Sequence, residues 1–276
     1  MAATDRAERA ARDAAANPWV QRLARAGYAA KGLVYVLIGV LAAQVAFGTG
    51  GQTTGTQGAL RQVAEMPFGS VLLVALAIGL AGYALWRLLE AGIDPEGEAH
   101  GAKGVARRIG YAISGIIYGA LAWSAIRLLG AGSGGGGGAK GWTARLMAQP
   151  FGPWLVGVVG AVLVGVGIYY VAKAYKTTFR KRLPPGRMDA RARDKLVKLG
   201  RFGIAARALV FVLSGVFLIV AALQADPSEA KGLGEVLSTL AAQPYGTLLL
   251  AVVALGLAAY GLYQFALARY RRFETA

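Results

Sequence analysis

The stretch Arg25-Ala26-Gly27-Tyr28-Ala29-Ala30-Lys31-Gly32-Leu33-Val34-Tyr35 decides the fold, because two related copies follow it in the chain. The second copy begins at Arg108 and the third at Arg201, and each is basic, then small, then apolar. A second phrase, proline followed by an aromatic residue and glycine, recurs with nearly the same displacements at residues 67–69, 150–152 and 244–246. Two phrases that recur together at nearly the same spacing indicate a threefold internal repeat.

The composition places this repeat in a membrane. Hydrophobic residues make up 56% of the chain and charged residues 16%, whereas a soluble domain has about 25% charged residues. The chain has no cysteine, and His100 is its only histidine. This composition excludes disulfides, cysteine nucleophiles and multi-histidine metal or haem sites, so we expect no metal and no cofactor.

Six uncharged or nearly uncharged runs are long enough to cross a bilayer as helices, because about 20 residues at a rise of 1.5 Å span its hydrocarbon core. The runs are 27–47, 69–86, 109–126, 151–172, 208–225 and 244–268. Two runs fall in each repeat. The sequence therefore predicts an all-α bundle of six transmembrane helices, made of three repeated helical hairpins with pseudo-threefold symmetry.

The basic residues predict the orientation of this bundle. Most lysines and arginines lie before the first run and after the second, fourth and sixth, whereas the opposite connections carry Arg61, Lys140, Arg145 and Lys231, with Arg127 at the outer end of the third run. By the positive-inside rule both termini are cytoplasmic, and we expect a multi-pass protein of the bacterial inner membrane. Four basic residues lie at the cytoplasmic ends of their runs, where we expect their long side chains to extend to the lipid headgroups: Lys31, Arg87, Lys173 and Arg207.

The repeat divides the chain into five parts. We assign an N-terminal cytoplasmic tail, a first repeat with two transmembrane helices, a second repeat, a basic cytoplasmic linker and a third repeat. Their ranges are 1–22, 23–93, 106–176, 177–198 and 199–273, respectively.

Each outer connection ends in a proline-aromatic-glycine corner. A short segment before each corner has apolar residues at helical spacing, which predicts an interfacial helix. The proline then stops this helix and the glycine turns the chain into the next span. We interpret the corners as structural, with contact to lipid or an extracytoplasmic partner as the alternative. The corner residues are Pro67, Phe68, Gly69, Pro150, Phe151, Gly152, Pro244, Tyr245 and Gly246.

The two repeated phrases, together with Gly79, Gly82, Tyr83 and Trp86 in the first repeat, resemble the bacterial "domain of unknown function 1206" membrane family. The resemblance covers roughly residues 23–273. It implies three tandem two-helix units and a family common in actinobacteria. It implies an architecture but no activity.

The best candidate site is a set of basic residues. Arg25, Arg108 and Arg201 occupy equivalent places in the three repeats, and Lys31 and Arg207 are equivalent to each other. They would bind an anion or lipid headgroups at the cytoplasmic side, although anchoring of the topology explains their positions equally well. The six runs contain no Asp or Glu. Glu90, just past the second run, is expected to form a local ion pair with Arg87 three residues before it.

Three function classes remain at this point. The first is a non-catalytic scaffold, accessory or lipid-interacting bundle, and the alternative is a channel or uniporter-like protein with a pore along the pseudo-threefold axis. An intramembrane enzyme is least supported, because no catalytic residues are found. The expected partners are membrane lipids with anionic headgroups, and a membrane protein or a second copy that packs on small-residue pairs such as Gly115 and Gly119. We expect no binding of nucleic acid.

Overall fold

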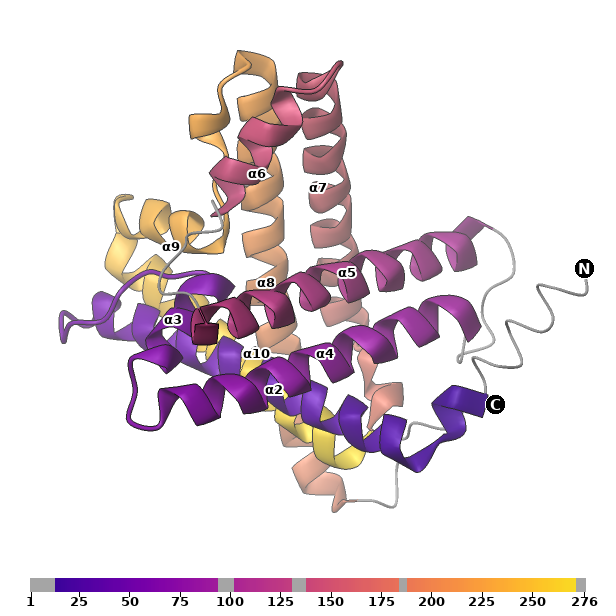
Figure 1. The fold of residues 1–276 in the computed structure, drawn as a ribbon. Helices are drawn as coiled ribbons and strands as arrows, with labels where there is room; N and C mark the ends of the chain where they lie inside the picture. Colours follow the sequence, from indigo (N-terminus) through magenta and orange to yellow (C-terminus); the bar gives the residue numbers. More distant parts are fainter. Residues whose placement is uncertain (1–12, 94–101, 131–137, 184–187, 272–276) are drawn as a thin grey trace, which may run out of the picture.

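The computed structural model describes residues 13–93, 102–130, 138–183 and 188–271, and all regular elements within these ranges are helical. Six of the helices are long and apolar enough to cross a membrane, which supports the predicted multi-pass membrane protein (Figure 1). They are α2 (Pro18–Ala46), α4 (Gly69–Ile93), α5 (Ala102–Gly130), α7 (Gly152–Lys176), α8 (Ala190–Gln224) and α10 (Gly246–Tyr270). Most of the predicted tail lies outside the described residues, and so do residues 131–137 of the second outer connection.

Three of the long helices, α2, α5 and α8, begin well before their apolar runs. The side chain of Asn17 caps α2 by accepting a hydrogen bond from the backbone N–H of Trp19 at 2.9 Å, and Asp189 caps α8 in the same way. Such caps satisfy N–H groups that have no partner within the helix. At 35 residues, α8 is longer than the roughly 20 residues that cross a hydrocarbon core. The basic end of α8 therefore extends beyond the apolar layer.

Three short helices precede the corners, as predicted: α3 (Thr56–Ala64), α6 (Gly138–Met147) and α9 (Leu233–Ala241). All three lie toward the opposite end of the bundle from the start of α2 and the end of α10 (Figure 1). Leu60 of α3 and Leu237 of α9 are fully buried. The second repeat differs, because Trp142 on the expected apolar face of α6 is 64% exposed.

The corners turn at the aromatic residue and not at the glycine. Phe68, Phe151 and Tyr245 have φ angles of 61°, 59° and 60°, which is the left-handed region, and each is at least 80% exposed. The glycine has another role, since a Cβ on Gly69 would lie only 2.3 Å from the carbonyl oxygen of Ala64. Gly246 is equally constrained, by Ala241. The glycine lets the short helix and the next long helix meet closely, while the strained aromatic residue makes the bend.

The packing of the long helices differs from three simple hairpins. The most extensive pairs join different repeats, namely α4 with α5, α7 with α8, and α10 with α2. Within repeats, α2 packs on α4 and α8 packs on α10, but α5 and α7 are not among the packed pairs. The helices thus follow the order α5, α4, α2, α10, α8, α7, and in Figure 1 the α7 and α8 pair runs steeply across the α4 and α5 pair.

Small residues at equivalent positions form the three seams between repeats. A Cβ on Gly32 of α2 would lie 2.9 Å from the carbonyl oxygen of Gly261 on α10, and one on Gly167 of α7 would lie 3.0 Å from that of Ala208 on α8. Gly115 of α5 meets α4 in the same way. Small residues let membrane helices approach this closely. The small-residue pair Gly115 and Gly119 therefore packs against α4 inside the bundle.

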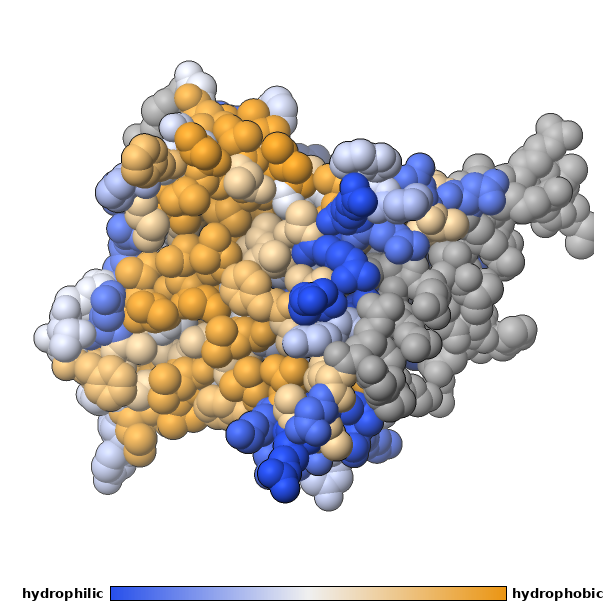
Figure 2. All heavy atoms as spheres, turned by 90° about the horizontal axis from the view of Figure 1, so that it is seen from below, coloured by the Kyte–Doolittle hydropathy of each residue, from blue (hydrophilic) through white to orange (hydrophobic). Residues whose placement is uncertain are grey.

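The outer helices of this arrangement present a broad apolar surface. In their most apolar windows, only 22% of α5 and 17% of α7 is buried, against 61% of α10. Figure 2 shows apolar residues spread over the middle of one face, with hydrophilic residues most densely gathered toward one side and fewer along the opposite edge. Soluble proteins rarely expose large contiguous apolar patches, so an apolar surface that extends along these long helices fits the hydrocarbon layer of a membrane.

Candidate functional site: a buried cluster of cations and tyrosines

Polar side chains from all six long helices meet inside the bundle. We call this group the cation–tyrosine cluster, and it combines four basic residues, one glutamate and six tyrosines. Its members are Tyr28, Lys31 and Tyr35 of α2, Tyr83, Arg87 and Glu90 of α4, Tyr118 of α5, Tyr170 of α7, Arg207 of α8, Tyr260 of α10, and Arg271 directly after α10.

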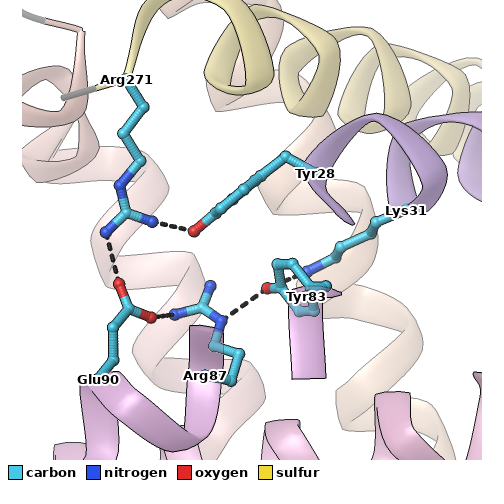
Figure 3. Close-up of polar contacts among 6 residues, drawn as sticks. All are labelled: Tyr28, Lys31, Tyr83, Arg87, Glu90 and Arg271. Carbon is cyan, nitrogen blue, oxygen red and sulfur yellow. Dashed lines mark hydrogen bonds and ion pairs between the residues drawn. The ribbon is translucent and has the colours of Figure 1, made fainter. Parts of the chain in front are cut away.

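One end of the cluster is a carboxylate held between two guanidinium groups (Figure 3). Glu90 is 1% exposed, and its two oxygens lie 2.6 Å from nitrogens of Arg87 and Arg271. Arg271 also donates a hydrogen bond to the hydroxyl of Tyr28. The predicted ion pair of Arg87 with Glu90 is confirmed. Burial lowers the pKa of Arg271 to about 10, so this guanidinium keeps its charge at neutral pH.

Tyr83 connects this end to Lys31. The Tyr83 hydroxyl accepts hydrogen bonds from Arg87 Nε and from Lys31 Nζ, both at 2.8 Å. The ammonium group of Lys31 also lies 4.5 Å from the ring centre of Tyr83, 4.8 Å from that of Tyr118 and 5.5 Å from that of Tyr260. Lys31 is thus held in a cage of aromatic rings, each of which attracts a cation.

The expected extension of Lys31 and Arg87 to the headgroups is wrong, because these residues are only 3% and 8% exposed. The hydroxyl of Tyr83 and the three rings of the cage hold the ammonium group inside the bundle. These interactions replace part of the hydration that a lysine otherwise seeks at the membrane surface.

Arg207 occupies the other end of the cluster. Its Nε and Nη1 donate hydrogen bonds to the hydroxyls of Tyr35 at 3.2 Å and Tyr260 at 3.0 Å. Its guanidinium lies 4.5 Å from the ring centre of Phe211 and 5.2 Å from that of Tyr170. Unlike Lys31, Arg207 is only partly buried. Within the described residues, it has no carboxylate partner and its Nη2 has no hydrogen-bond acceptor.

The cluster carries an excess of positive charge. Its four cations, Lys31, Arg87, Arg207 and Arg271, face the single carboxylate of Glu90, so its formal charge is four minus one, or +3. Burying charge in an apolar medium is costly unless it is compensated. Cation–π contacts compensate by about 0.5–2 kcal/mol each. These contacts leave the formal charge unchanged, so the cluster keeps its excess of positive charge.

The other three predicted basic residues lie outside the cluster. Arg25 donates to the carbonyl oxygen of Arg269 near the end of α10 at 3.2 Å, and Arg108 donates to that of Ala91 near the end of α4 at 2.7 Å. Arg201 lies 5.8 Å from the ring centre of Tyr175 near the end of α7. Helix ends have carbonyl groups without helical partners and a partial negative charge. The five predicted residues therefore divide into three at helix ends and two, Lys31 and Arg207, in the cluster.

The tyrosines and Arg271 were not predicted as site residues. A signal for the tyrosines exists in the sequence, since Tyr35 and Phe211 follow Lys31 and Arg207 by four residues, and Tyr118 is their equivalent in the second repeat. Residues four apart share one face of a helix. Arg271 gives no such signal, because it reaches Glu90 from the far end of the chain.

Six apolar helices in three tandem repeats, with a basic cluster between them, define a multi-pass membrane protein of all-helical class. The model of the family described as Domain of Unknown Function (DUF1206) matches residues 26–94, 109–177 and 202–271, and the chain belongs to this family. It is 40% identical over 247 residues to "Uncharacterized protein YxxB" of Bacillus subtilis (strain 168), with 90% of each chain covered. No solved structure matches the chain.

Proposed function

We propose that this protein is a non-catalytic bundle of the bacterial inner membrane that binds the anionic headgroups of membrane lipids. The observation that carries this proposal is the formal charge of +3 in the cation–tyrosine cluster. Arginine suits a phosphate group because its planar guanidinium donates two hydrogen bonds side by side. Arg207 would be the main contact, since it is the more exposed cation and has a donor nitrogen to offer.

Lys31 would support the same headgroup. Tyr260 links the two cations, because its ring centre is 5.5 Å from Lys31 Nζ and 5.0 Å from the guanidinium carbon of Arg207. A phosphate near Tyr260 would interact with both charges. A channel or uniporter has less support, because the rings of Tyr83 and Tyr118, 4.6 Å apart, fill space at the junction of the helices.

Retention of lipid by the purified protein tests this proposal. Arg207→Gln should reduce bound cardiolipin or phosphatidylinositol about tenfold in native mass spectrometry, which corresponds to the loss of one charge-assisted hydrogen bond. Arg207→Lys should retain more lipid than Arg207→Gln, and the exposed Arg191→Gln is the matched control. The triple variant Arg25→Gln, Arg108→Gln and Arg201→Gln should keep its lipid. Equal retention in a correctly folded Arg207→Gln protein would contradict the proposal.

The symmetry of the bundle and its orientation in the membrane can also be inferred. We infer pseudo-threefold symmetry about an axis along the membrane normal, with both termini in the cytoplasm. The equivalent glycines in the three seams between repeats support the symmetry, and the basic connections support the orientation.

Cysteine labelling tests the orientation, since the chain has no native cysteine. A cysteine in place of Gly136 should react with a membrane-impermeant thiol reagent in intact cells, and one in place of Gly186 should react only after the cells are opened. The positive-inside rule gives this expectation. The reverse pattern would place the termini outside.

A further inference from the structure

In the second repeat, the two long helices α5 and α7 do not pack on each other, whereas the two long helices of each other repeat do. In the first repeat, a Cβ on Gly27 would lie 2.5 Å from the backbone nitrogen of Tyr83, and in the third a Cβ on Gly203 would lie 2.4 Å from that of Tyr260. Gly110 is the equivalent glycine of the second repeat, yet no described atom lies within 4 Å of its Cβ position. Gly165, the equivalent of Gly82, is equally open.

This opening interrupts a ring of helices. If α5 packed on α7 as α2 packs on α4, the six long helices would form a closed ring, because all the other neighbouring pairs are packed. Instead, α5 and α7 are the two ends of a row and diverge (Figure 1). Between these two helices, the side of the bundle is therefore not closed by a packed helix pair.

The cation–tyrosine cluster lies between the two separated helices. Tyr118 of α5 contacts Lys31, Tyr170 of α7 contacts Arg207, and Tyr260 lies next to both cations. Arg207, the cation nearest to α7, is the partly exposed one. Its Nη2, without an acceptor among the described residues, is a donor that an entering anion would satisfy.

The sides of the opening are apolar. On α5, Ile113 and Ile117 share the helix face of Gly110 and are 45% and 53% exposed. On α7, Val158 and Val162 share the face of Gly165 and are 59% and 50% exposed. A ligand that reaches Arg207 between these faces meets hydrocarbon along its path and positive charge at its end.

We propose that the opening between α5 and α7 is a lateral portal for one anionic lipid of the cytoplasmic leaflet. Its phosphate contacts Arg207 and lies near Lys31, and its acyl chains lie against the apolar faces of α5 and α7. This inference rests on the proposed function and makes the ligand a lipid that enters from the membrane, in preference to a free anion. Complementarity argues for this occupant, because an anionic lipid matches both the positive cluster and the apolar sides.

A tryptophan placed in the opening tests the portal in the full-length protein. Gly165→Trp should reduce retained cardiolipin or phosphatidylglycerol about tenfold in native mass spectrometry, as much as Arg207→Gln does. Val171→Trp is the matched control, since Val171 is exposed on another face of α7. Inorganic phosphate, added to delipidated protein, should raise the thermal unfolding temperature less than the lipid does.

The outcomes separate the two proposals. If Arg207→Gln loses lipid and Gly165→Trp does not, the portal is wrong and the headgroup site stands. If neither variant loses lipid, the proposed function fails and the portal fails with it. If only Gly165→Trp loses lipid, the bound lipid does not use Arg207. If phosphate raises the unfolding temperature as much as lipid does, the ligand is a free anion. Either result would overturn the portal. A dimer of the parent protein that Gly165→Trp dissociates would assign the opening to a second copy.

Photo-crosslinking keeps the test independent of variants that fail to fold. A phosphatidylglycerol with a photoreactive group on its acyl chain should label α5 and α7 of the unchanged protein about thirtyfold more than a phosphatidylcholine with the same group, on the basis of two basic residues near the headgroup. Equal labelling by the two lipids, or labelling confined to other helices, would contradict the portal.

Discussion

Glu90→Gln is expected to lower the free energy of unfolding by about 3–5 kcal/mol, the loss typical of removing one partner from a buried ion pair. Glu90 is the only carboxylate of the cation–tyrosine cluster and contacts both Arg87 and Arg271 at 2.6 Å. Glutamine has nearly the same shape but no charge, so two buried guanidinium groups would lose their counter-ion. Titration of the purified protein from mild detergent into dodecyl sulfate, followed by circular dichroism, measures the change.

The chain offers a matched control for this experiment. Asp194 lies 3.2 Å from Arg180, but the two side chains are 60% and 51% exposed. Asp194→Asn should therefore cost no more than about 1 kcal/mol. The double variant Glu90→Gln with Arg271→Gln should recover part of the loss, because one uncompensated cation is removed as well. A Glu90→Gln protein as stable as Asp194→Asn would contradict the buried double ion pair.

Gly203→Leu should destabilise the protein by about 3 kcal/mol or more, whereas Gly110→Leu should change its stability by less than about 0.5 kcal/mol. The two glycines are equivalent in sequence. A side chain at Gly203 would collide with the backbone of Tyr260, which cannot move aside without separating α8 from α10. Gly110 faces open space in the described structure. Thermal unfolding of both variants in the same detergent gives the comparison.

Similar losses in the two leucine variants would mean that α5 and α7 close on each other in solution. Gly27→Leu extends the comparison to the first repeat, where α2 packs on α4 and a large loss of stability is expected. The three variants thus measure, one repeat at a time, whether the two long helices of a repeat pack on each other.

The sequence predicts the elements of this fold better than their pairing. The repeated phrases locate the three repeats, and the apolar runs locate six helices that differ from the runs mainly by their extra turns at the basic side. Small-residue pairs show that a helix face packs closely. They do not identify the partner helix, because every long helix carries such residues. The hairpin prediction paired neighbours in the chain, and the second repeat departs from it.

The candidate site was predictable in part. Repetition identified Lys31 and Arg207, the two cations at its centre. It also grouped them with Arg25 and Arg108, which contact helix carbonyl groups instead. Position along a run does not reveal whether a basic side chain extends to the membrane surface or remains inside. That depends on whether aromatic rings from other helices surround it.

The pairing of α2 with α10 has a consequence for synthesis of the protein. The main partner of the first long helix is the last, and Arg25 contacts backbone carbonyl groups more than 240 residues later in the chain. Until the ribosome has delivered α10, the glycines of α2 that form this seam and the aromatic cage of Lys31 lack their final neighbours. Contacts between residues so distant in the chain also form slowly. Assembly of the bundle is therefore completed only after all six long helices have been made.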